Sequence, residues 1–367
     1  MSQQPLLSVH DLHVKFRLRG RILHALRGVS LDVFPGESLA IVGESGSGKS
    51  VLNKNFIGLL DKNGFIDGGS IRYFGDAALC ERLSPGSALE GRPYAELCAL
   101  KKESEWLGIR GKEICMIPQD PMTSLNPLKR IGAQIGEAIS LHTGLRGEAA
   151  KKAVLQILED VKIDNPAKRY RQYPHELSGG MRQRVVIAIA IACNPKILIC
   201  DEPTTALDVT IQAQILALLK ELRKKYNLTI LFITHDLGVV ANIADRVAVM
   251  YAGDIVEIGL ANEVFYNPGH PYTWALLSSL PQLGIRGEEL YSIKGTPPNL
   301  FADVAGDAFA PRNPHALVID HMTRPPYFDL SPTHRARTWL LDPRAPKVSA
   351  PDSIAKLCDL GGMANGK

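Results

Sequence analysis

The sequence predicts an α/β fold in which a mostly parallel β-sheet is flanked by helices. Two observations support this fold class. Short apolar strands alternate with helical segments over residues 197–260, as expected when each strand is followed by a helix that covers the sheet. A glycine-rich segment at residues 43–50 also follows an apolar strand and precedes a helix, which is the usual context of a loop that binds phosphate.

The elements are predicted in chain order from the spacing of apolar residues and from turn-forming residues. Alternating apolar residues favour strands near the N-terminus, whereas a spacing of three or four favours helices in the middle of the chain. The expected elements are strands over 7–16, 29–34 and 38–42, a helix from Lys49, a helical region over 131–193, a strand over 197–200, a helix over 211–226, a strand over 229–233, a short helix after His235, and strands near Val247 and Ile255.

Two segments interrupt this pattern. Residues 80–102 combine charged residues with the turn-forming sequences SPG and GRP, so we expect a surface loop inserted in the fold. After about Asn267 the chain becomes rich in proline and other breakers, which indicates an appended C-terminal region.

The composition indicates a globular chain without a membrane span of its own. Of 367 residues 45% are apolar, and the net charge of +4 arises from 42 basic and 38 acidic residues, with no basic block typical of nucleic acid binding. The longest apolar run, residues 185–192, is far shorter than the ~20 residues that a transmembrane helix needs. Six scattered cysteines indicate a reducing compartment, and the N-terminus has no signal-peptide pattern.

The segment GESGSGKS at residues 43–50 matches the pattern GxxxxGK[ST]. Its glycines allow backbone N–H groups to curl around an anion, and the helix that follows directs its positive end at the phosphates. Lys49 is expected to contact the β- and γ-phosphates of ATP, and the Ser50 hydroxyl to bind Mg²⁺. The expected nucleotide contacts are Gly43, Glu44, Ser45, Gly46, Ser47, Gly48, Lys49, Ser50 and Val51.

An acidic pair follows the buried strand at residues 197–200. Because ligands bind at the carboxyl ends of strands in open α/β sheets, Asp201 and Glu202 are expected near the phosphate loop. Asp201 would hold the Mg²⁺ shell, and Glu202 would polarise the attacking water. The alternative is an acidic pair that merely begins a solvated loop, and the presence of the phosphate loop argues against it.

Further motifs resemble those of the ATP-binding cassette (ABC) family and occur in that family's order over residues 7–265. LSGGMRQ at 177–183 resembles the family signature, Gln119 its Q-loop and His235 its switch histidine. The resemblance implies a P-loop NTPase core of ABC type with an antiparallel β-subdomain, a helical signature subdomain and a small irregular C-terminal extension. It also implies that Gln119 and His235 join Glu202 in hydrolysis, that Gln119 contributes to the Mg²⁺ site, and that Phe16 stacks on adenine unless it is a core residue.

The signature is implied to contact a nucleotide through Ser178, Gly179 and Gly180, together with Asp208 after the acidic strand. Ser178 and Gly180 precede a helix, so they offer a hydroxyl and a flexible backbone at its N-terminus. By the resemblance, this second site serves the nucleotide of the opposite subunit. One chain carries one phosphate loop and one signature, so two chains should meet head to tail.

Longer stretches resemble the D-type ATP-binding subunits of oligopeptide and dipeptide permeases. They include QDPMTSLNP at 119–127, YPHELSGGMRQR at 173–184 and NPGHPYT at 267–273. The resemblance implies a second ABC ATPase subunit, hence a heterodimer, two transmembrane permease subunits and an external solute-binding protein, with no nucleic acid partner and a peripheral position on the cytoplasmic face of the inner membrane. It divides the chain into a nucleotide-binding domain at 1–266 with a helical subdomain at about 120–194, an extension at 267–346 and a tail at 347–367 that we expect to be flexible.

The C-terminal extension departs from the subfamily pattern, which often has four cysteines that hold an iron–sulfur cluster. The matching positions here are Asp307, Asn313, Asp320 and Thr338. Because such clusters are held chiefly by thiolates, we expect none in this chain, and apolar contacts should replace it. The alternative is a zinc site from His315, His321 and His334 with those aspartates, but this spacing follows no ligand template. The extension is expected to support assembly with the partner rather than the nucleotide site.

Two other functions compete with energising a peptide importer. The chain would equally serve an importer of nickel or another small solute, because the receptor and the membrane subunits select the cargo. A soluble ABC ATPase that acts on nucleic acid or ribosomes usually has two cassettes in one chain or a long coiled coil, and this sequence has neither.

Overall fold

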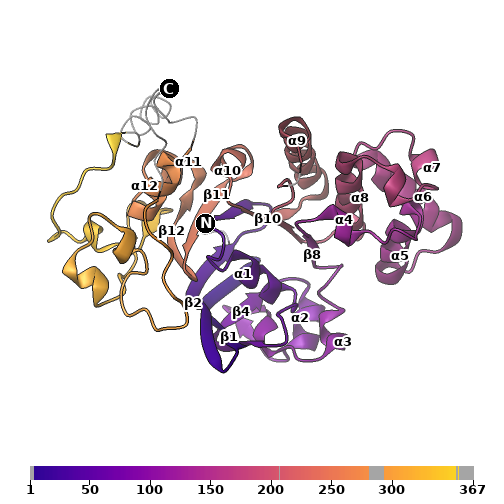
Figure 1. Ribbon diagram of the computed structural model, residues 1–367. Helices are drawn as coiled ribbons and strands as arrows, with labels where there is room; N and C mark the ends of the chain where they lie inside the picture. The colour runs from indigo at the N-terminus through magenta and orange to yellow at the C-terminus, as the bar shows by residue number, and fades with distance from the viewer. Residues whose placement is uncertain (1–3, 206, 281–292, 353, 355–367) are drawn as a thin grey trace.

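The computed structural model describes residues 4–205, 207–280, 293–352 and 354. Figure 1 shows an elongated molecule with a helical lobe at one end and the C-terminal part at the other, while the N-terminal strands lie below the central sheet. Two main sheets organise the described residues, one four-stranded and one eight-stranded. Within the described part of the chain, no helix is long and apolar enough to cross a membrane.

The N-terminal sheet is antiparallel and has the strand order β2-β1-β4-β7. The apolar residues of β1 face a core in which Leu7, Leu12 and Val14 are fully buried. The β1–β2 hairpin turns at Arg19 and Gly20, which both have positive φ, as two-residue hairpins favour. The strands are β1 Leu7–Leu18, β2 Arg21–Val33, β4 Gly64–Tyr73 and β7 Ala95–Glu96.

The prediction of a surface loop over residues 80–102 is wrong for part of that segment. The segment contains the end of α2 (Ala77–Leu83), β5 (Ala88–Leu89), β6 (Arg92–Pro93), β7 and the 3-10 turn η1 (Leu97–Ala99). Cys80, Ala95 and Leu97 are buried in the same core as β1. The glycines and prolines that suggested a loop instead form the turns between these short packed elements.

The central sheet has the order β13-β14-β12-β11-β3-β10-β9-β8, and its five strands from β11 to β8 pair in parallel. Alternate residues of β10 enter two cores: Leu231 packs with the N-terminal sheet, whereas Phe232 packs with the helices. Because both faces are covered, these strands are continuous apolar runs. The strands are β3 Ser38–Val42, β8 Ile114–Ile117, β9 Ile197–Asp201, β10 Thr229–Thr234, β11 Arg246–Tyr251 and β12 Asp254–Leu260.

The helical lobe lies at the end of the molecule away from the C-terminal part (Figure 1), and its apolar interior is continuous with the core on one face of the central sheet. The predicted helical region contains two helices with buried apolar faces, formed by Ile131, Ile135 and Ile139 on one helix and by Val154 and Leu158 on the next. The helices are α4 Pro121–Ser124, α5 Ile131–Thr143, α6 Gly147–Asp160, α7 Pro166–Arg169 and α8 Gly179–Ile191, and α9 Val209–Tyr226 and α10 Leu237–Ile243 follow in the core.

The C-terminal part is joined to the core by sheet pairing and by a buried carboxylate. Strand β14 (Arg335–Ala336) pairs with β12 and with β13 (Phe328–Asp329). The fully buried Glu257 of β12 accepts hydrogen bonds from the backbone of Gly269 at 2.6 Å and His270 at 3.0 Å, and lies 2.7 Å from Nε2 of His334. The helices of this part are α11 Ala261–Tyr266 and α12 Pro271–Ser278, with 3-10 turns η4 Ala310–Arg312, η5 Val318–His321 and η6 Trp339–Leu341.

The predicted tail at 347–367 lies only partly within the described residues. Ile354 is fully buried in a core that also contains Tyr251 and Tyr272. The rest of that tail beyond Ile354, including Cys358, lies outside the described residues. The domain boundaries given above remain predictions.

Candidate nucleotide-binding site

The predicted phosphate loop leaves the end of β3 and runs into α1 (Lys49–Phe56). Position 43 requires glycine, because a Cβ there would lie 2.0 Å from the carbonyl oxygen of Met250. Gly48 caps the N-terminus of α1 with a φ of 104°, and a Cβ there would lie 2.9 Å from the carbonyl oxygen of Ala25. The loop therefore packs tightly against β2 and β11, and the positive end of α1 is directed at the site.

The Lys49 side chain folds back over this loop. Its Nζ donates hydrogen bonds to the carbonyl oxygens of Gly43 at 2.7 Å and Glu44 at 2.9 Å. Burial lowers the pKa of Lys49, while the carboxylates of Glu202 and Asp201 act to raise it. The ammonium group thus lies between the loop and the acidic strand end, where a phosphate-binding cation is needed.

Strand β9 brings Asp201 to the start of α1. Burial raises the pKa of the Asp201 carboxyl and the charge of Glu202 raises it further, whereas Lys49 and a hydrogen bond from the Ser50 hydroxyl lower it. Ser50 and Asp201, the predicted ligands of Mg²⁺, are therefore in direct contact although they lie on different elements.

The Glu202 carboxylate is held by three side chains. Its Oε2 accepts hydrogen bonds from Nε2 of Gln119 and Oγ1 of Thr205, and its Oε1 pairs with Nδ1 of His235, each at 3.0 Å. Burial acts to raise the pKa of Glu202, but the hydrogen bonds from His235 and Thr205 outweigh it, so the net pKa lies below its usual value. The carboxylate is ionised at neutral pH and has a fixed orientation.

A cavity of about 950 Å³ contains these groups. Gln119, Glu202 and His235 line it together with residues of the phosphate loop and with Phe16 and Leu23 of the N-terminal sheet. Its volume and mixed polar and apolar lining suit a nucleotide, whose phosphates and base need different surroundings.

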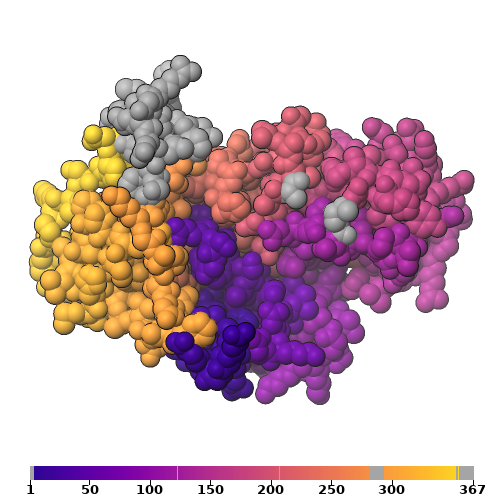
Figure 2. All heavy atoms as spheres, in the orientation of Figure 1, coloured from indigo at the N-terminus to yellow at the C-terminus, as the bar shows by residue number. Residues whose placement is uncertain are grey.

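Residues 298–301 of the C-terminal part also line this cavity. The carbonyl oxygen of Leu300 accepts a hydrogen bond from the backbone of His24 at 2.9 Å, and the guanidinium of Arg21 lies 4.7 Å from the centre of the Phe301 ring. Figure 2 shows orange atoms of the C-terminal part against indigo atoms of the N-terminal sheet. The expectation that the extension lies apart from the nucleotide site is therefore wrong, because residues 298–301 form a wall of this cavity. The role of the extension in assembly stays a prediction.

Phe16 is mainly a core residue. It is 8% exposed and packs beside Leu60, and a Cβ at Gly64 would lie 2.8 Å from its ring. Only part of the ring faces the cavity, so its predicted stacking on adenine remains a prediction.

The predicted signature residues lie elsewhere in the fold. Ser178 caps α8, where its Oγ accepts a hydrogen bond from the backbone of Met181 at 3.3 Å, and Asp208 caps α9 in the same way. Gly179 has open space around it, whereas a Cβ at Gly180 would lie 2.9 Å from Ile211. None of the described residues that line the cavity belongs to the signature. This separation is expected if these residues serve the nucleotide of another subunit.

Comparison with known proteins decides the family. Residues 26–205 match the ABC transporter family, and residues 256–318 match the C-terminal region of oligopeptide/dipeptide transporters. The chain is 54% identical to the oligopeptide transport ATP-binding protein AmiE of Streptococcus pneumoniae, over 96% of this chain and 94% of that protein.

The chain belongs to the ABC transporter family. It is also 53% identical to the oligopeptide transport ATP-binding protein OppD of Bacillus subtilis, over 95% of this chain and 92% of that protein. The dipeptide transport ATP-binding protein DppD of Lactococcus lactis is 52% identical over 96% of both chains. The predicted resemblance to oligopeptide and dipeptide permease ATP-binding subunits is confirmed.

Solved structures of ABC proteins share the fold. The post-hydrolysis dimer of the ATP-binding cassette MJ0796, bound to ADP and Pi, matches with a TM-score of 0.57 and 25% identity over 70% of this chain and 98% of that chain. CbiO1 of Clostridium perfringens matches with a TM-score of 0.57 and 27% identity over 72% and 92% of the two chains. The predicted ABC-type α/β fold is confirmed, and membership of this ATPase family implies that the chain binds ATP.

Sequence reasoning missed several residues that the structure places at this ABC site. Thr205 holds Glu202, and its only sequence signal is its position three residues after that carboxylate. The C-terminal residues at the site have no local signal, because they reach it only through folding. They are Tyr272 and Arg312, which contact the phosphate loop, and Pro298, Asn299, Leu300 and Phe301 of the cavity wall.

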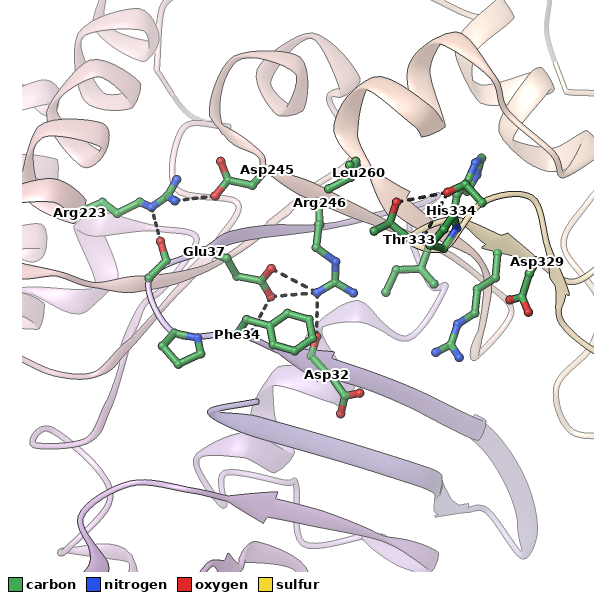
Figure 3. Close-up of a pocket in the computed structure, with 16 residues that line it drawn as sticks. Asp32, Phe34, Glu37, Arg223, Asp245, Arg246, Leu260, Asp329, Thr333 and His334 are labelled. Carbon is green, nitrogen blue, oxygen red and sulfur yellow. Dashed lines mark hydrogen bonds and ion pairs between the residues drawn. The ribbon is translucent and has the colours of Figure 1, made fainter. Parts of the chain in front are cut away.

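A second pocket, of about 620 Å³, lies between the core and the C-terminal part (Figure 3). Two of its arginines pair with carboxylates of the pocket: Arg246 lies 3.1 Å from Glu37, and Arg223 lies 2.5 Å from Asp245. Because these charges are neutralised within the protein, we assign the nucleotide to the cavity at the phosphate loop.

The four positions expected in place of cluster cysteines are buried and form turns. Each side chain accepts a hydrogen bond from a nearby backbone N–H: Asp307 from Phe309, Asn313 from His315, Asp320 from Leu317 and Thr338 from Leu340. These groups do not fit an iron–sulfur cluster, which requires thiolates. In the residues that the structure describes, no group of three or more His, Cys, Asp or Glu side chains could hold a metal ion, which counts against the zinc alternative. Absence of the cluster stays a prediction, which iron and sulfide analysis of an anaerobic preparation would check.

Proposed function

We propose that this ABC protein hydrolyses ATP to energise the import of oligopeptides or dipeptides. The observation that carries the proposal is the Glu202 carboxylate, fixed by Gln119, Thr205 and His235 at 3.0 Å each beside the phosphate loop. A carboxylate in this position can orient a water for attack on the γ-phosphate. The names of the relatives, which are oligopeptide and dipeptide transport ATP-binding proteins, support the cargo class.

The residues of the site take distinct roles in the proposed reaction. Lys49 and the backbone N–H groups of the loop bind the phosphates, and Glu202 orients the attacking water while His235 senses the γ-phosphate. Ser50, Asp201 and Gln119 provide oxygen ligands of the kind that Mg²⁺ prefers. Bound Mg²⁺ would neutralise phosphate charge. Electrostatic stabilisation and positioning supply most of the rate in such reactions, which explains why the carboxylate is so firmly held.

The active form is proposed to be a head-to-tail heterodimer with a second ABC ATPase subunit. The signature residues Ser178, Gly179 and Gly180 do not line this chain's cavity, so they suit the nucleotide of the partner. A helix N-terminus such as that of α8 attracts phosphate charge. The dimeric cassette MJ0796, which shares this fold, supports assembly of two cassettes.

The permease subunits are proposed to dock in a largely apolar groove of about 610 Å³ beside the active site. The groove lies between β8, α5 and α8, and Pro118, which precedes Gln119 directly, is among its lining residues. Leu59 and Leu141 at the groove are 46% and 71% exposed, and they lie together in one largely apolar groove, as at surfaces that bind another protein. A helix docked here would connect the membrane subunit to Gln119 and through it to Glu202.

The complete importer is proposed to contain two transmembrane permease subunits and an external solute-binding protein, with this chain peripheral on the cytoplasmic face of the membrane. The test is reconstitution in proteoliposomes with the subunits encoded beside this gene. Receptor loaded with a peptide should stimulate ATP hydrolysis and peptide uptake. Stimulation by a nickel-loaded receptor, and not by a peptide-loaded one, would instead assign the chain to an importer of nickel or another small solute. ATP hydrolysis that responds to nucleic acid would refute the transport role.

A further inference from the structure

Glu44, the second residue of the phosphate loop, is held by residues far along the chain. Its carboxylate accepts two hydrogen bonds from Arg312, Nη1 to Oε2 at 2.7 Å and Nη2 to Oε1 at 3.1 Å. Its backbone N–H donates to the Tyr272 hydroxyl at 2.8 Å. Both partners belong to the C-terminal part, so that part holds Glu44 through its side chain and through its backbone N–H.

Arg312 is itself a rigid anchor. Its side chain is only 5% exposed, and it also donates to the carbonyl oxygen of Lys294 at 3.0 Å and to the Tyr251 hydroxyl at 3.2 Å. Tyr251, Tyr272 and Phe309 pack against one another, with ring centres 4.5 to 5.4 Å apart. The planar guanidinium is therefore fixed in the orientation that a two-point contact with a carboxylate requires.

The same Glu44 also binds the phosphate-binding lysine. Its carbonyl oxygen accepts a hydrogen bond from Nζ of Lys49 at 2.9 Å. A displaced Glu44 would therefore move the Lys49 ammonium and the N–H groups of the loop together. Arg312, Glu44 and Lys49 form a continuous series of contacts from the C-terminal part to the phosphates' position.

We propose that Arg312 is a positioning residue for nucleotide binding: through Glu44 it holds the phosphate loop and Lys49 in the conformation that binds the phosphates of ATP. Arg312 does not line the cavity, so it acts only through the loop. Tyr272 acts in the same direction, because it fixes the backbone of Glu44. The C-terminal part thereby sets ATP affinity, an inference that rests on the ATPase function proposed above.

The test compares ATP binding by calorimetry on the full-length chain with steady-state hydrolysis by the assembled transporter. Arg312→Ala should weaken ATP binding roughly tenfold, because loss of one partner of a hydrogen-bonded charge pair leaves the other under-compensated. Arg312→Lys should recover only part of this affinity, since an ammonium cannot make the two-point contact. KM for ATP should rise while kcat at saturating ATP stays within about twofold, because Arg312 touches no reacting group.

Two controls separate positioning from general stability. Arg344→Ala removes an arginine of the same region that also pairs with an aspartate, Asp342, but is 86% exposed, and it should leave ATP binding unchanged. The double variant, which combines Glu44→Ala with Arg312→Ala, should bind ATP no more weakly than Arg312→Ala alone. Both substitutions remove the same Arg312–Glu44 contact, so the second has nothing further to remove. Additive losses would mean that the two residues act separately and would overturn the proposal.

The outcomes distinguish this inference from the proposed function. Wild-type affinity and KM in Arg312→Ala, while Lys49→Ala loses binding, would overturn the positioning role and leave the ATPase assignment intact. A wild-type protein that binds no ATP would overturn both. If Arg312→Ala does not fold, Arg312→Lys decides: a raised KM with unchanged kcat supports the proposal, and an unchanged KM contradicts it.

Discussion

His235 and Gln119 bind opposite oxygens of the Glu202 carboxylate, His235 at Oε1 and Gln119 at Oε2, each at 3.0 Å. The two side chains follow different strands, β10 and β8, while Glu202 itself follows β9 between them. One carboxylate therefore joins the carboxyl ends of three neighbouring strands. A change in the charge or orientation of this carboxylate should therefore reduce ATP hydrolysis while the protein still folds.

The first prediction tests the carboxylate itself. Glu202→Gln keeps the size of the side chain but removes the charge that orients the attacking water, and it replaces one accepting oxygen with a donating amide group. ATP and Mg²⁺ should still bind, while hydrolysis in the partnered complex should fall by on the order of 10² or more. Thr205→Ser, which retains the hydroxyl that contacts Glu202, is the matched control and should remain active. Wild-type turnover in Glu202→Gln would exclude this residue as the general base.

The second prediction concerns pH. Hydrogen bonds from His235 and Thr205 hold the pKa of Glu202 below its usual value, against the effect of burial. A group with a lowered pKa keeps its ionised form until the pH falls through that pKa, so the acid limb of hydrolysis should lie at low pH. Thr205→Val removes one hydrogen bond at nearly constant size, and the acid limb of kcat/KM should move to higher pH. An unmoved limb would show that another group controls it.

The sequence was sufficient to predict the parts of the site that are local. Gly43 to Ser50 could be predicted because the backbone geometry demands glycine at fixed spacing, and Glu202 because it ends an apolar strand. That Gln119 and His235 meet on one carboxylate could not be predicted, since it depends on the order of β8, β9 and β10 in the sheet. The order of strands is a property of tertiary packing and not of any one segment.

The contacts between the C-terminal part and the phosphate loop were still harder to predict from the sequence. Arg312 and Glu44 are 268 positions apart, and neither residue type signals the other. Breaker-rich composition predicted an appended region, but it could not reveal that β14 pairs with β12 and brings the region back to the phosphate loop. Short irregular segments have weak local preferences, so their positions are set by the core on which they pack.

The third prediction tests the head-to-tail arrangement. Ser178→Arg places a long cation at the N-terminus of α8, a position that in this chain lies outside its own cavity. Binding of ATP by the isolated chain should therefore be unchanged, whereas hydrolysis at the partner's site in the assembled transporter should fall by on the order of tenfold or more. Site-specific assays that use a partner with an intact phosphate loop and Glu202→Gln in this chain would resolve the two sites. Unchanged hydrolysis at the partner's site in that background would refute the arrangement.

The fourth prediction concerns Asp307, one of the residues expected in place of a cluster cysteine. Burial raises the pKa of Asp307 to about 7, and Asp320 and Asp254 add to this, while a hydrogen bond from the backbone of Phe309 opposes it. Because the folded pKa exceeds the unfolded value, the folded protein binds more protons than the unfolded chain between these two pKa values. The contribution of Asp307 to stability is greatest at low pH and is lost as the pH rises to about 7.

Asp307→Asn tests this sign, because it keeps the oxygen that accepts the Phe309 N–H but cannot ionise. The variant should match the wild type near pH ~4 and exceed it above pH ~7 by on the order of 4 kcal/mol in the free energy of unfolding, as about three pKa units imply. Asp329→Asn, at an exposed aspartate of the same region, is the control and should give no such dependence. Chemical denaturation at several pH values measures the difference. If the wild type is instead the more stable protein at high pH, Asp307 is ionised and paired there, and a bound cation becomes the first explanation to test.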